Sequence, residues 1–130
     1  HIKFVSLEVN AGSFEKHEAK LSLLMEDSNR EIKSKGNGPV DATFNAIKKI
    51  TKYNFKLSLY QVHAITAGTD AQGEVTVRLE DKNLSSQAKG SDPDIIVASA
   101  KAYVNALNKL IYKKDKSFPD HLSEISVKGV

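Results

Sequence analysis

Apolar and polar residues alternate along three segments in the N-terminal half of the chain, as in half-buried β-strands. The predicted strands span residues 2–9, 17–27 and 30–34, the last of them short and polar. The strongest breaker in the sequence, Gly36-Asn37-Gly38-Pro39, follows. Apolar residues then recur at helical spacing as far as Lys52. Pro39 suits a first helical turn and Asp41 favours the positive end of a helix dipole. This half therefore predicts a β-β-β-α order.

The second half of the chain repeats this layout. Its predicted strands span residues 56–66, 74–80 and 84–88, with a loop over residues 67–73. The apolar phase shifts between Leu59 and Tyr60, which indicates a β-bulge. A long helix is predicted over residues 93–113, with Asp92 as its N-cap and Pro93 as its first residue. Lysines near residue 113 suit the C-terminal end of that helix.

Short identities in sequence support an internal repeat. Residues 44–50 match 104–110, residues 23–27 echo 77–81, and residues 7–11 echo 60–64. We therefore predict an α+β fold in which two pseudo-symmetric βββα units pack together, each helix lying against a three-stranded antiparallel sheet. Such packing would bring the two helix N-termini near the shared interface.

The predicted boundaries follow from this repeat. The whole chain, residues 1–130, is expected to form one domain, with unit one at about 2–53, unit two at about 56–114 and a tail at 115–130. The tail includes a possible last strand at 125–127, and a turn is expected at 11–13. The chain begins at His1 without a methionine, so we expect it to be a piece of a longer protein.

Composition narrows the possible classes of function. The absence of cysteine excludes disulfide scaffolds, cysteine-zinc sites and thiol catalysis, and it fits a reducing, cytoplasmic compartment. The 19 basic and 16 acidic side chains leave a net charge of +3, too small to argue for nucleic acid. No apolar run is long enough for a membrane span. We therefore expect a globular domain that binds neither nucleic acid nor membrane.

Catalytic patterns are missing from the sequence. The four histidines have no metal-ligand spacing, and no phosphate loop or nucleophile elbow occurs. The carboxylates are scattered over positions that face solvent in the predicted elements. We therefore expect no enzyme activity from this chain alone, no catalytic residue, and no metal or cofactor in this domain.

The two glycine-containing turns before the helices are the best candidates for binding chemistry. Free backbone N–H groups and the helix dipole make a helix start suitable for a carboxylate or phosphate. An adjacent acid, Asp41 or Asp94, could neutralise an ammonium group, and small residues would leave room for a side chain. The alternative is that glycine and proline only interrupt the chain and that Asp41 and Asp94 only cap the helices.

Three motifs resemble a known family. They are GNGPVDA at 36–42, YQVHAITAGTDA at 60–71, and DIIVASAKAY at 94–103 followed by NALN at 105–108. In this order they resemble the C-terminal regulatory domain of 2-isopropylmalate synthase, and citramalate synthase carries a similar domain. The resemblance covers about residues 2–113 and includes all three motifs.

The resemblance implies an allosteric domain that binds the end product of a pathway and inhibits a separate catalytic barrel of the same full-length chain. That barrel, where a divalent metal is expected, makes 2-isopropylmalate from acetyl-CoA and 2-oxoisovalerate. Two regulatory domains are expected to pair in a homodimer, with the effector near their interface. The positions that match the family's effector pocket are Gly38, Val40, Asp41, Leu57, Tyr60, Ala64, Ala71, Ser91, Pro93 and Asp94.

The resemblance also suggests roles for these residues. Backbone N–H groups of the two turns would hold the effector carboxylate, and Asp41 would hold its ammonium group. Leu57, Tyr60, Ala64 and Ala71 would surround its side chain. The second turn departs from the family pattern Gly-x-Gly, because Pro93 removes one N–H donor, and this favours the first turn for the carboxylate.

L-Leucine is the first-choice effector, and L-isoleucine, as in citramalate synthase, is the alternative. One displaced methyl group changes affinity by only about 1–3 kcal/mol, so the sequence does not separate the two. A more remote alternative is a basic module that docks nucleic acid or protein. Its lysines would be Lys48, Lys49, Lys52, Lys113, Lys114 and Lys116. Phosphate binding would weaken steeply with salt, whereas zwitterion binding would not.

Overall fold

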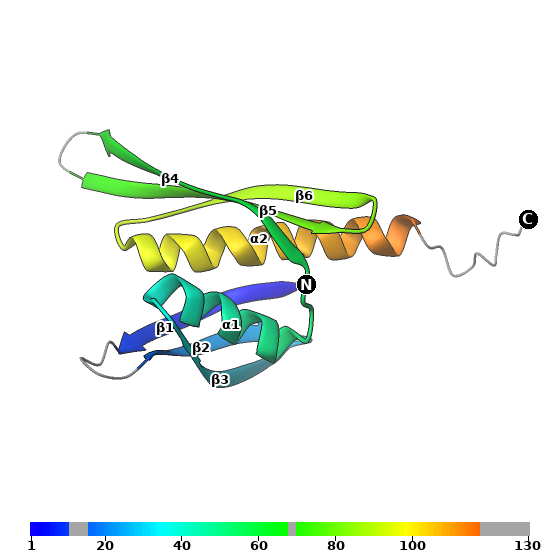
Figure 1. The fold of residues 1–130 in the computed structure, drawn as a ribbon, viewed down its shortest axis with the longest axis horizontal. Helices are drawn as coiled ribbons and strands as arrows, with labels where there is room; N and C mark the ends of the chain where they lie inside the picture. The colour runs from blue at the N-terminus through cyan, green and yellow to red at the C-terminus, as the bar shows by residue number, and fades with distance from the viewer. Residues whose placement is uncertain (11–15, 68–69, 118–130) are drawn as a thin grey trace, which may run out of the picture.

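The computed structural model describes residues 1–10, 16–67 and 70–117 and contains the β-β-β-α order twice (Figure 1). Unit one comprises β1 (Ile2–Asn10), β2 (His17–Met25), β3 (Ser28–Gly36) and α1 (Pro39–Thr51). Unit two comprises β4 (Lys56–Ala67), β5 (Asp70–Asp81), β6 (Leu84–Asp92) and α2 (Ile95–Ser117). Each unit has one antiparallel three-stranded sheet, in the orders β1-β2-β3 and β4-β5-β6. The predicted fold class is confirmed.

Several strands are longer than their apolar alternation predicts. β3 begins at Ser28 and ends at Gly36, and β6 continues past Ala88 to Asp92. The loop predicted over residues 67–73 is wrong for Ala67, which ends β4, and for residues 70–73, which belong to β5 and pair with β4. Backbone ladders account for these differences, because main-chain pairing continues through polar residues that carry no hydrophobic signal. The turn expected at 11–13 and the last strand expected at 125–127 lie outside the described residues.

The first strand of each unit, β1 or β4, carries a bulge at the equivalent position. The register shifts between Leu57 and Leu59 in β4, which confirms the predicted bulge, and between Phe4 and Ser6 in β1. Leu7 and Tyr60 are each two residues beyond the bulged residue, Val5 or Ser58. Over the described residues 7–10 and 60–63, the predicted match is therefore structural as well as sequential.

The helices confirm a second part of the predicted repeat. The side chain of Asn45 donates to the carbonyl of Lys35 at 3.0 Å, and that of Asn105 donates to the carbonyl of Lys89 at 2.9 Å. These two asparagines are equivalent in the match of 44–50 to 104–110. The echo of 23–27 in 77–81, by contrast, is out of register by two residues. The β2–β3 turn lies at 26–27 and the β5–β6 turn at 82–83, so residue 25 corresponds to residue 81.

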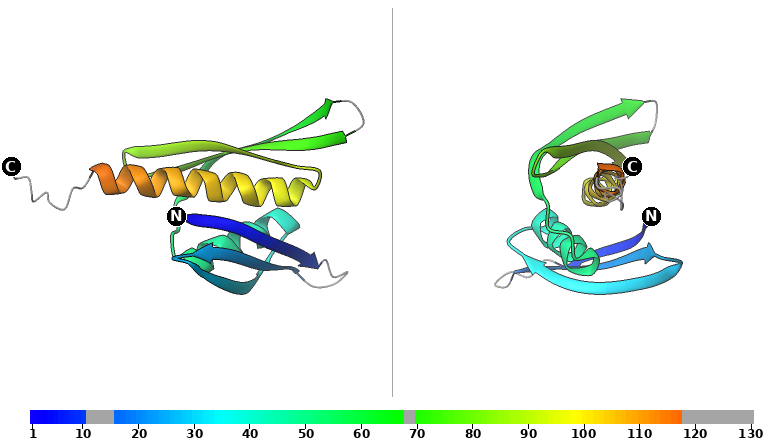
Figure 2. Two further views of the ribbon diagram at one scale, coloured as in Figure 1. Left: turned by 180° about the vertical axis from the view of Figure 1, so that it is seen from behind. Right: turned by 90° about the vertical axis from the view of Figure 1, so that its right-hand side faces the viewer.

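Helix α2 lies at the centre of the molecule, between its own sheet and unit one (Figure 2). It is therefore buried over a wider surface than the predicted stripe, and alanines allow close packing against the sheet. Its buried residues are Ala98, Ser99, Ala100, Ala102, Tyr103, Val104, Ala106, Leu107 and Leu110. Gly90 of β6 lies close to the backbone of α2, because an added Cβ would lie 2.5 Å from the Ala102 nitrogen.

The predicted start of the second helix is wrong by two residues. Helix α2 begins at Ile95, and Asp94 caps it, because one Asp94 carboxylate oxygen accepts from the N–H groups of Ile96 and Val97 at 2.8 and 3.4 Å. Asp92 remains in β6, where it pairs with Gly73. The start of α1 at Pro39 is confirmed. None of the helices in the described residues is long and apolar enough to span a bilayer.

Candidate functional site

The N-terminus of α1 has no side-chain cap. Gly38 is the N-cap residue in an extended conformation and has no side chain to accept from the first turn. Asp41 instead accepts a hydrogen bond from the backbone N–H of Asn37 at 2.8 Å, so its carboxylate lies over the turn before the helix. Pro39 has no N–H and the N–H of Ala42 bonds to the carbonyl of Gly38, so the N–H groups of Val40 and Asp41 are the ones without a side-chain cap that could meet an anion.

The two glycines of this turn, Gly36 and Gly38, differ in whether packing within the protomer requires a glycine. A Cβ on Gly36 would lie 2.4 Å from the nitrogen and 2.7 Å from the Cα of Ala42, so close packing of α1 on β3 requires glycine there. A Cβ on Gly38 would meet nothing within 4 Å, and its φ of −152° is open to any residue. Packing within the protomer therefore does not explain Gly38, and space beside the helix start stays open.

Tyr60 joins the two helices on the β4 side of this opening. Its ring packs edge-on against Phe44 of α1 at 5.7 Å between centroids, one helical turn after Val40. Its hydroxyl lies 2.8 Å from the Ser99 hydroxyl of α2. Ser99 donates its single hydroxyl proton to the carbonyl of Ile95 at 2.8 Å, so Tyr60 is the donor to Ser99. Gly38, Val40 and Asp41 thus form the start of α1, and Tyr60 contacts the same helix at Phe44, one turn further on.

The other predicted side-chain contacts lie along the β4–β5 hairpin, which reaches past the N-terminal end of α2 (Figure 1). Ala64 and Ala71 are exposed on it, and Ala64 pairs with Gly73, which approaches Ile95 of α2 closely. Leu57 is seven residues from Ala64 on the same strand, a separation of roughly 20 Å. One small ligand therefore cannot contact both Leu57 and Ala64 of the same protomer.

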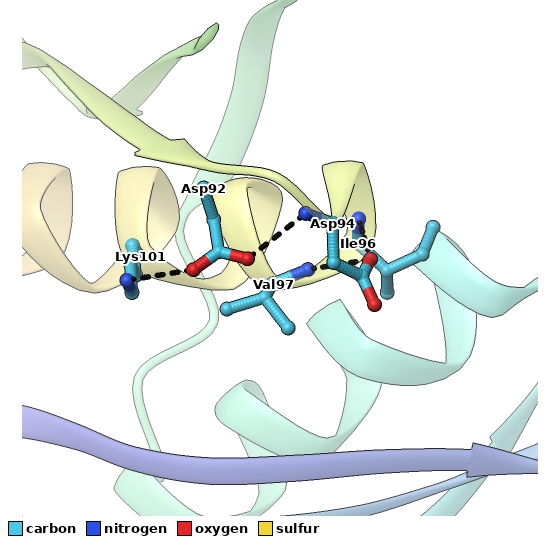
Figure 3. Close-up of polar contacts among 5 residues, drawn as sticks. All are labelled: Asp92, Asp94, Ile96, Val97 and Lys101. Carbon is cyan, nitrogen blue, oxygen red and sulfur yellow. Dashed lines mark hydrogen bonds and ion pairs between the residues drawn. The ribbon is translucent and has the colours of Figure 1, made fainter. Parts of the chain in front are cut away.

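The second turn is occupied by its own acids (Figure 3). Asp94 accepts hydrogen bonds from two N–H groups of α2, and Pro93 has no N–H to donate. This turn therefore has no free donors for a ligand carboxylate. Asp92 accepts from the N–H of Asp94 at 2.9 Å and from Lys101 at 3.1 Å. The Asp94 N–H first, and then Lys101, hold the pKa of Asp92 below its usual range. Ser91 is an exposed residue of β6 that pairs with Glu74.

A hollow of about 310 Å³ lies on the β1 side of the two helix starts. We call it the β1 pocket, and its lining residues are Leu7, Val9, His17, Pro39, Asp94, Ile96 and Val97. The first residue of α1 and the N-cap of α2 line the same hollow, which confirms the prediction that both helix N-termini lie near the interface of the units. Asp94 is the one residue of the predicted effector set in this lining.

Sequence reasoning missed the buried residues that support Tyr60. Phe44 packs against Tyr103 at 4.7 Å between ring centroids, and Tyr103 is 1% exposed. Burial raises the pKa of Tyr103 to about 12, and its hydroxyl has no hydrogen-bond partner among the described residues. The i, i+4 spacing of Ser99 and Tyr103 on α2 is a helical signal, but core residues and site-supporting residues share that signal.

The lysines considered for a docking module mostly have structural partners. The ammonium groups of Lys49 and Lys113 donate to the strand carbonyls of Lys33 and Ser85 at 3.4 and 2.6 Å. Lys114 pairs with Asp81, and Lys116 lies over the ring of Tyr112. The contacts of Lys49, Lys113 and Lys114 hold each helix against its sheet, and that of Lys116 lies within α2, so these four lysines have structural roles.

Comparison with known proteins decides the family. The sequence profile of the LeuA allosteric (dimerisation) domain matches residues 1–111, which include both units, the α1 start and Tyr60. The chain belongs to this family. As a LeuA allosteric domain it is a regulatory module, and the family description as a dimerisation domain implies a homodimer.

Curated relatives of this LeuA allosteric domain are 2-isopropylmalate synthases. Those of Rhodopseudomonas palustris strain BisB18 and Bradyrhizobium sp. strain ORS 278 are each 50% identical to it, over 118 and 121 residues. The synthase of Afipia carboxidovorans is 49% identical over 118 residues. These matches cover 91–92% of the chain and 23% of each relative, so the chain spans about a quarter of their length.

Proposed function

We propose that this chain is the feedback sensor of a 2-isopropylmalate synthase, and that it binds L-leucine beside the start of α1. The observation that carries the proposal is the uncapped α1 N-terminus at Gly38, where no side chain occupies the helix N–H groups or the space beside them. The family match and the synthase relatives support the choice of a leucine-pathway effector.

The chemistry around this helix start suits both charges of an amino acid. The free N–H groups of the first turn would receive the carboxylate, with the helix dipole adding to the attraction. Asp41 accepts one backbone N–H through Oδ2, which leaves its other carboxylate oxygen for an ammonium group. Val40 and Tyr60 would contact the aliphatic side chain, with Ala64 and Ala71 contributing from the hairpin.

The dimer completes this proposal. Ala64, Ala71 and Leu57 are exposed in one protomer, so the site is open on its hairpin side. We propose that a second regulatory domain closes it, and that Leu57 contacts the effector from the partner, since it is too distant within one protomer. An effector held between two protomers favours one arrangement of the dimer, and by that differential binding it would restrain the catalytic part of the longer chain.

Calorimetric titration of the chain with L-leucine, L-isoleucine and L-valine tests the proposal. We expect L-leucine to bind best, and binding to change little with salt. In Asp41→Asn the side-chain oxygen still accepts from Asn37, but the charge for the ammonium group is lost, so affinity should fall about tenfold or more. Asp115→Asn, an exposed carboxylate near the end of α2, is the matched control and should leave the isotherm unchanged.

Other outcomes separate the alternatives. A preference for L-isoleucine would assign the domain to citramalate-synthase-like regulation with the same site. Unchanged affinity in Asp41→Asn would remove Asp41 from the site. If a folded, dimeric chain bound none of the three amino acids at millimolar concentration, the effector proposal would be wrong for this domain.

A further inference from the structure

The β1 pocket occupies, in unit one, the place that the Tyr60 side of the proposed effector site occupies in unit two. Leu7 and Val9 are two and four residues past the bulge of β1, as Tyr60 and Val62 are past the bulge of β4. Val9 pairs with Ala19 on β2, and Val62 pairs with Val75 on β5. The internal repeat therefore places the β1 pocket in unit one and the Tyr60 side of the proposed effector site in unit two at equivalent positions.

The next equivalent residue of β2 and β5 distinguishes the two positions chemically. Two positions before Ala19 stands His17, and two before Val75 stands Gly73, so His17 and Gly73 are repeat equivalents. Gly73 has no side chain, and the end of the Ile95 side chain packs over it, where an added Cβ would lie 1.8 Å from that terminal carbon. His17 is half-buried and lines the β1 pocket. Unit one therefore has an imidazole side chain at the position where unit two has a glycine.

The β1 pocket is lined by an acid, Asp94, as well as by this imidazole. Asp94 uses Oδ1 to cap α2, and no bond of the described residues occupies Oδ2, which Figure 3 draws free of contacts. The rest of the lining is aliphatic, from Leu7, Val9, Ile96 and Val97 with the ring of Pro39. Its volume of about 310 Å³ is at the small end of the roughly 300–1,000 Å³ range of ligand sites.

We propose that the β1 pocket is a second ligand site of this domain and takes a small aliphatic α-amino acid. Asp94 Oδ2 receives the ammonium group, an N–H of the His17 ring donates to the carboxylate, and the branched side chain lies against Leu7, Val9 and Val97. The ligand carboxylate is bound by a side chain rather than by a helix N-terminus, because Asp94 already accepts hydrogen bonds from the first free N–H groups of α2. The inference rests on the proposed function only for the choice of L-leucine as the first probe.

Residue-resolved titration tests this proposal. The ¹⁵N-labelled chain is titrated with L-leucine, and amide shifts are followed separately at the β1 pocket (Val9, His17, Val97) and at the α1 site (Gly38, Tyr60). We expect saturable shifts at both groups and a calorimetric stoichiometry of two amino acids per protomer. Asp94→Asn keeps an N-cap acceptor for α2 and removes the charge. It should weaken the β1-pocket response about tenfold or more and leave the α1 response unchanged.

Two further variants make the result decisive. Asp41→Asn should have the reciprocal effect, so failure of the α1 site and failure of the β1 pocket are distinguishable. Val97→Phe fills the pocket with a larger apolar group and should abolish the β1-pocket response, with far-UV circular dichroism confirming the fold. The proposal is overturned if Val9, His17 and Val97 do not respond to millimolar L-leucine, or if their response survives both Asp94→Asn and Val97→Phe. The proposal is also overturned if the partner protomer of the dimer fills the β1 pocket both with and without L-leucine.

Discussion

The carboxamide of Asn108 makes two hydrogen bonds to the backbone of Ile2, one to its N–H and one to its carbonyl. The N–H of Ile2 donates to Asn108 Oδ1 at 2.9 Å, and Asn108 Nδ2 donates to the carbonyl of Ile2 at 2.7 Å. Ile2 opens unit one and Asn108 lies in the helix of unit two. Among the hydrogen bonds of the described residues, this pair is the one that joins the units. In the repeat, Asn108 corresponds to Lys48, so the contact breaks the symmetry of the two halves.

Removing this carboxamide should loosen β1 from α2. Asn108→Ala deletes two partly buried hydrogen bonds and should lower the free energy of unfolding by about 1–3 kcal/mol. Amide hydrogen exchange should accelerate at Ile2 and its neighbours in β1 more than in β4–β6. Asn105→Ala, which loses one bond to Lys89 inside unit two, is the control and should leave β1 protection intact. Equal exchange of β1 in wild type and Asn108→Ala would contradict the role of Asn108.

Gly36 and Gly38 should respond oppositely to alanine. Gly36→Ala places a Cβ against the backbone of Ala42 and should cost about 1–3 kcal/mol of stability, as overpacking does. Gly38→Ala meets no neighbour and should change stability by less than about 1 kcal/mol, while it obstructs the proposed carboxylate position and weakens L-leucine binding. Urea unfolding and calorimetry on both variants measure the two effects. A Gly38→Ala protein with wild-type affinity would count against ligand contact at the α1 start.

The repeat was predictable because its signals are local. Breakers at residues 36–39, a bulge in β4 and the match of 44–50 to 104–110 all depend on neighbouring residues, and the structure confirms them. The strand ends were not predictable in the same way. Residues 70–73 and 89–92 are polar or small, and only pairing with adjacent strands makes them part of a sheet.

The helix cap and the interface of the units show a second limit. Asp92 and Asp94, on either side of Pro93, are both suitable N-cap residues for α2. Asp94 is the N-cap because Asp92 remains in β6 and forms an ion pair with Lys101. Asn108 looks like one more polar position on α2, and its partner Ile2 is 106 residues away. The β1 pocket likewise joins residues from four elements, and no single segment of the sequence contains it.

Tyr103 should make stability depend on alkaline pH. Burial raises its pKa to about 12 in the folded chain, whereas the unfolded residue titrates near 10. Its contribution is therefore complete below pH 10 and is lost as pH rises toward 12, by at most about 2–3 kcal/mol. Tyr103→Phe removes both this titration and a buried hydroxyl without a partner among the described residues, so it should be neutral or stabilising at pH 7. Urea unfolding at several pH values, with Tyr112→Phe as the exposed control, measures the difference; identical pH profiles would refute it.

Tyr60→Phe should separate the two contacts that hold this ring. The variant keeps the edge-on packing against Phe44 and loses only the donation to Ser99, whose own proton still goes to the carbonyl of Ile95. We expect a loss of about 0.5–1.5 kcal/mol in stability. Ser99→Ala should cost a similar amount, and the double variant should cost less than the sum, because both remove the same bond. Additive losses in this double-mutant cycle would mean that Tyr60 and Ser99 act independently. Phe44 would then be the main contact that orients Tyr60 beside the start of α1.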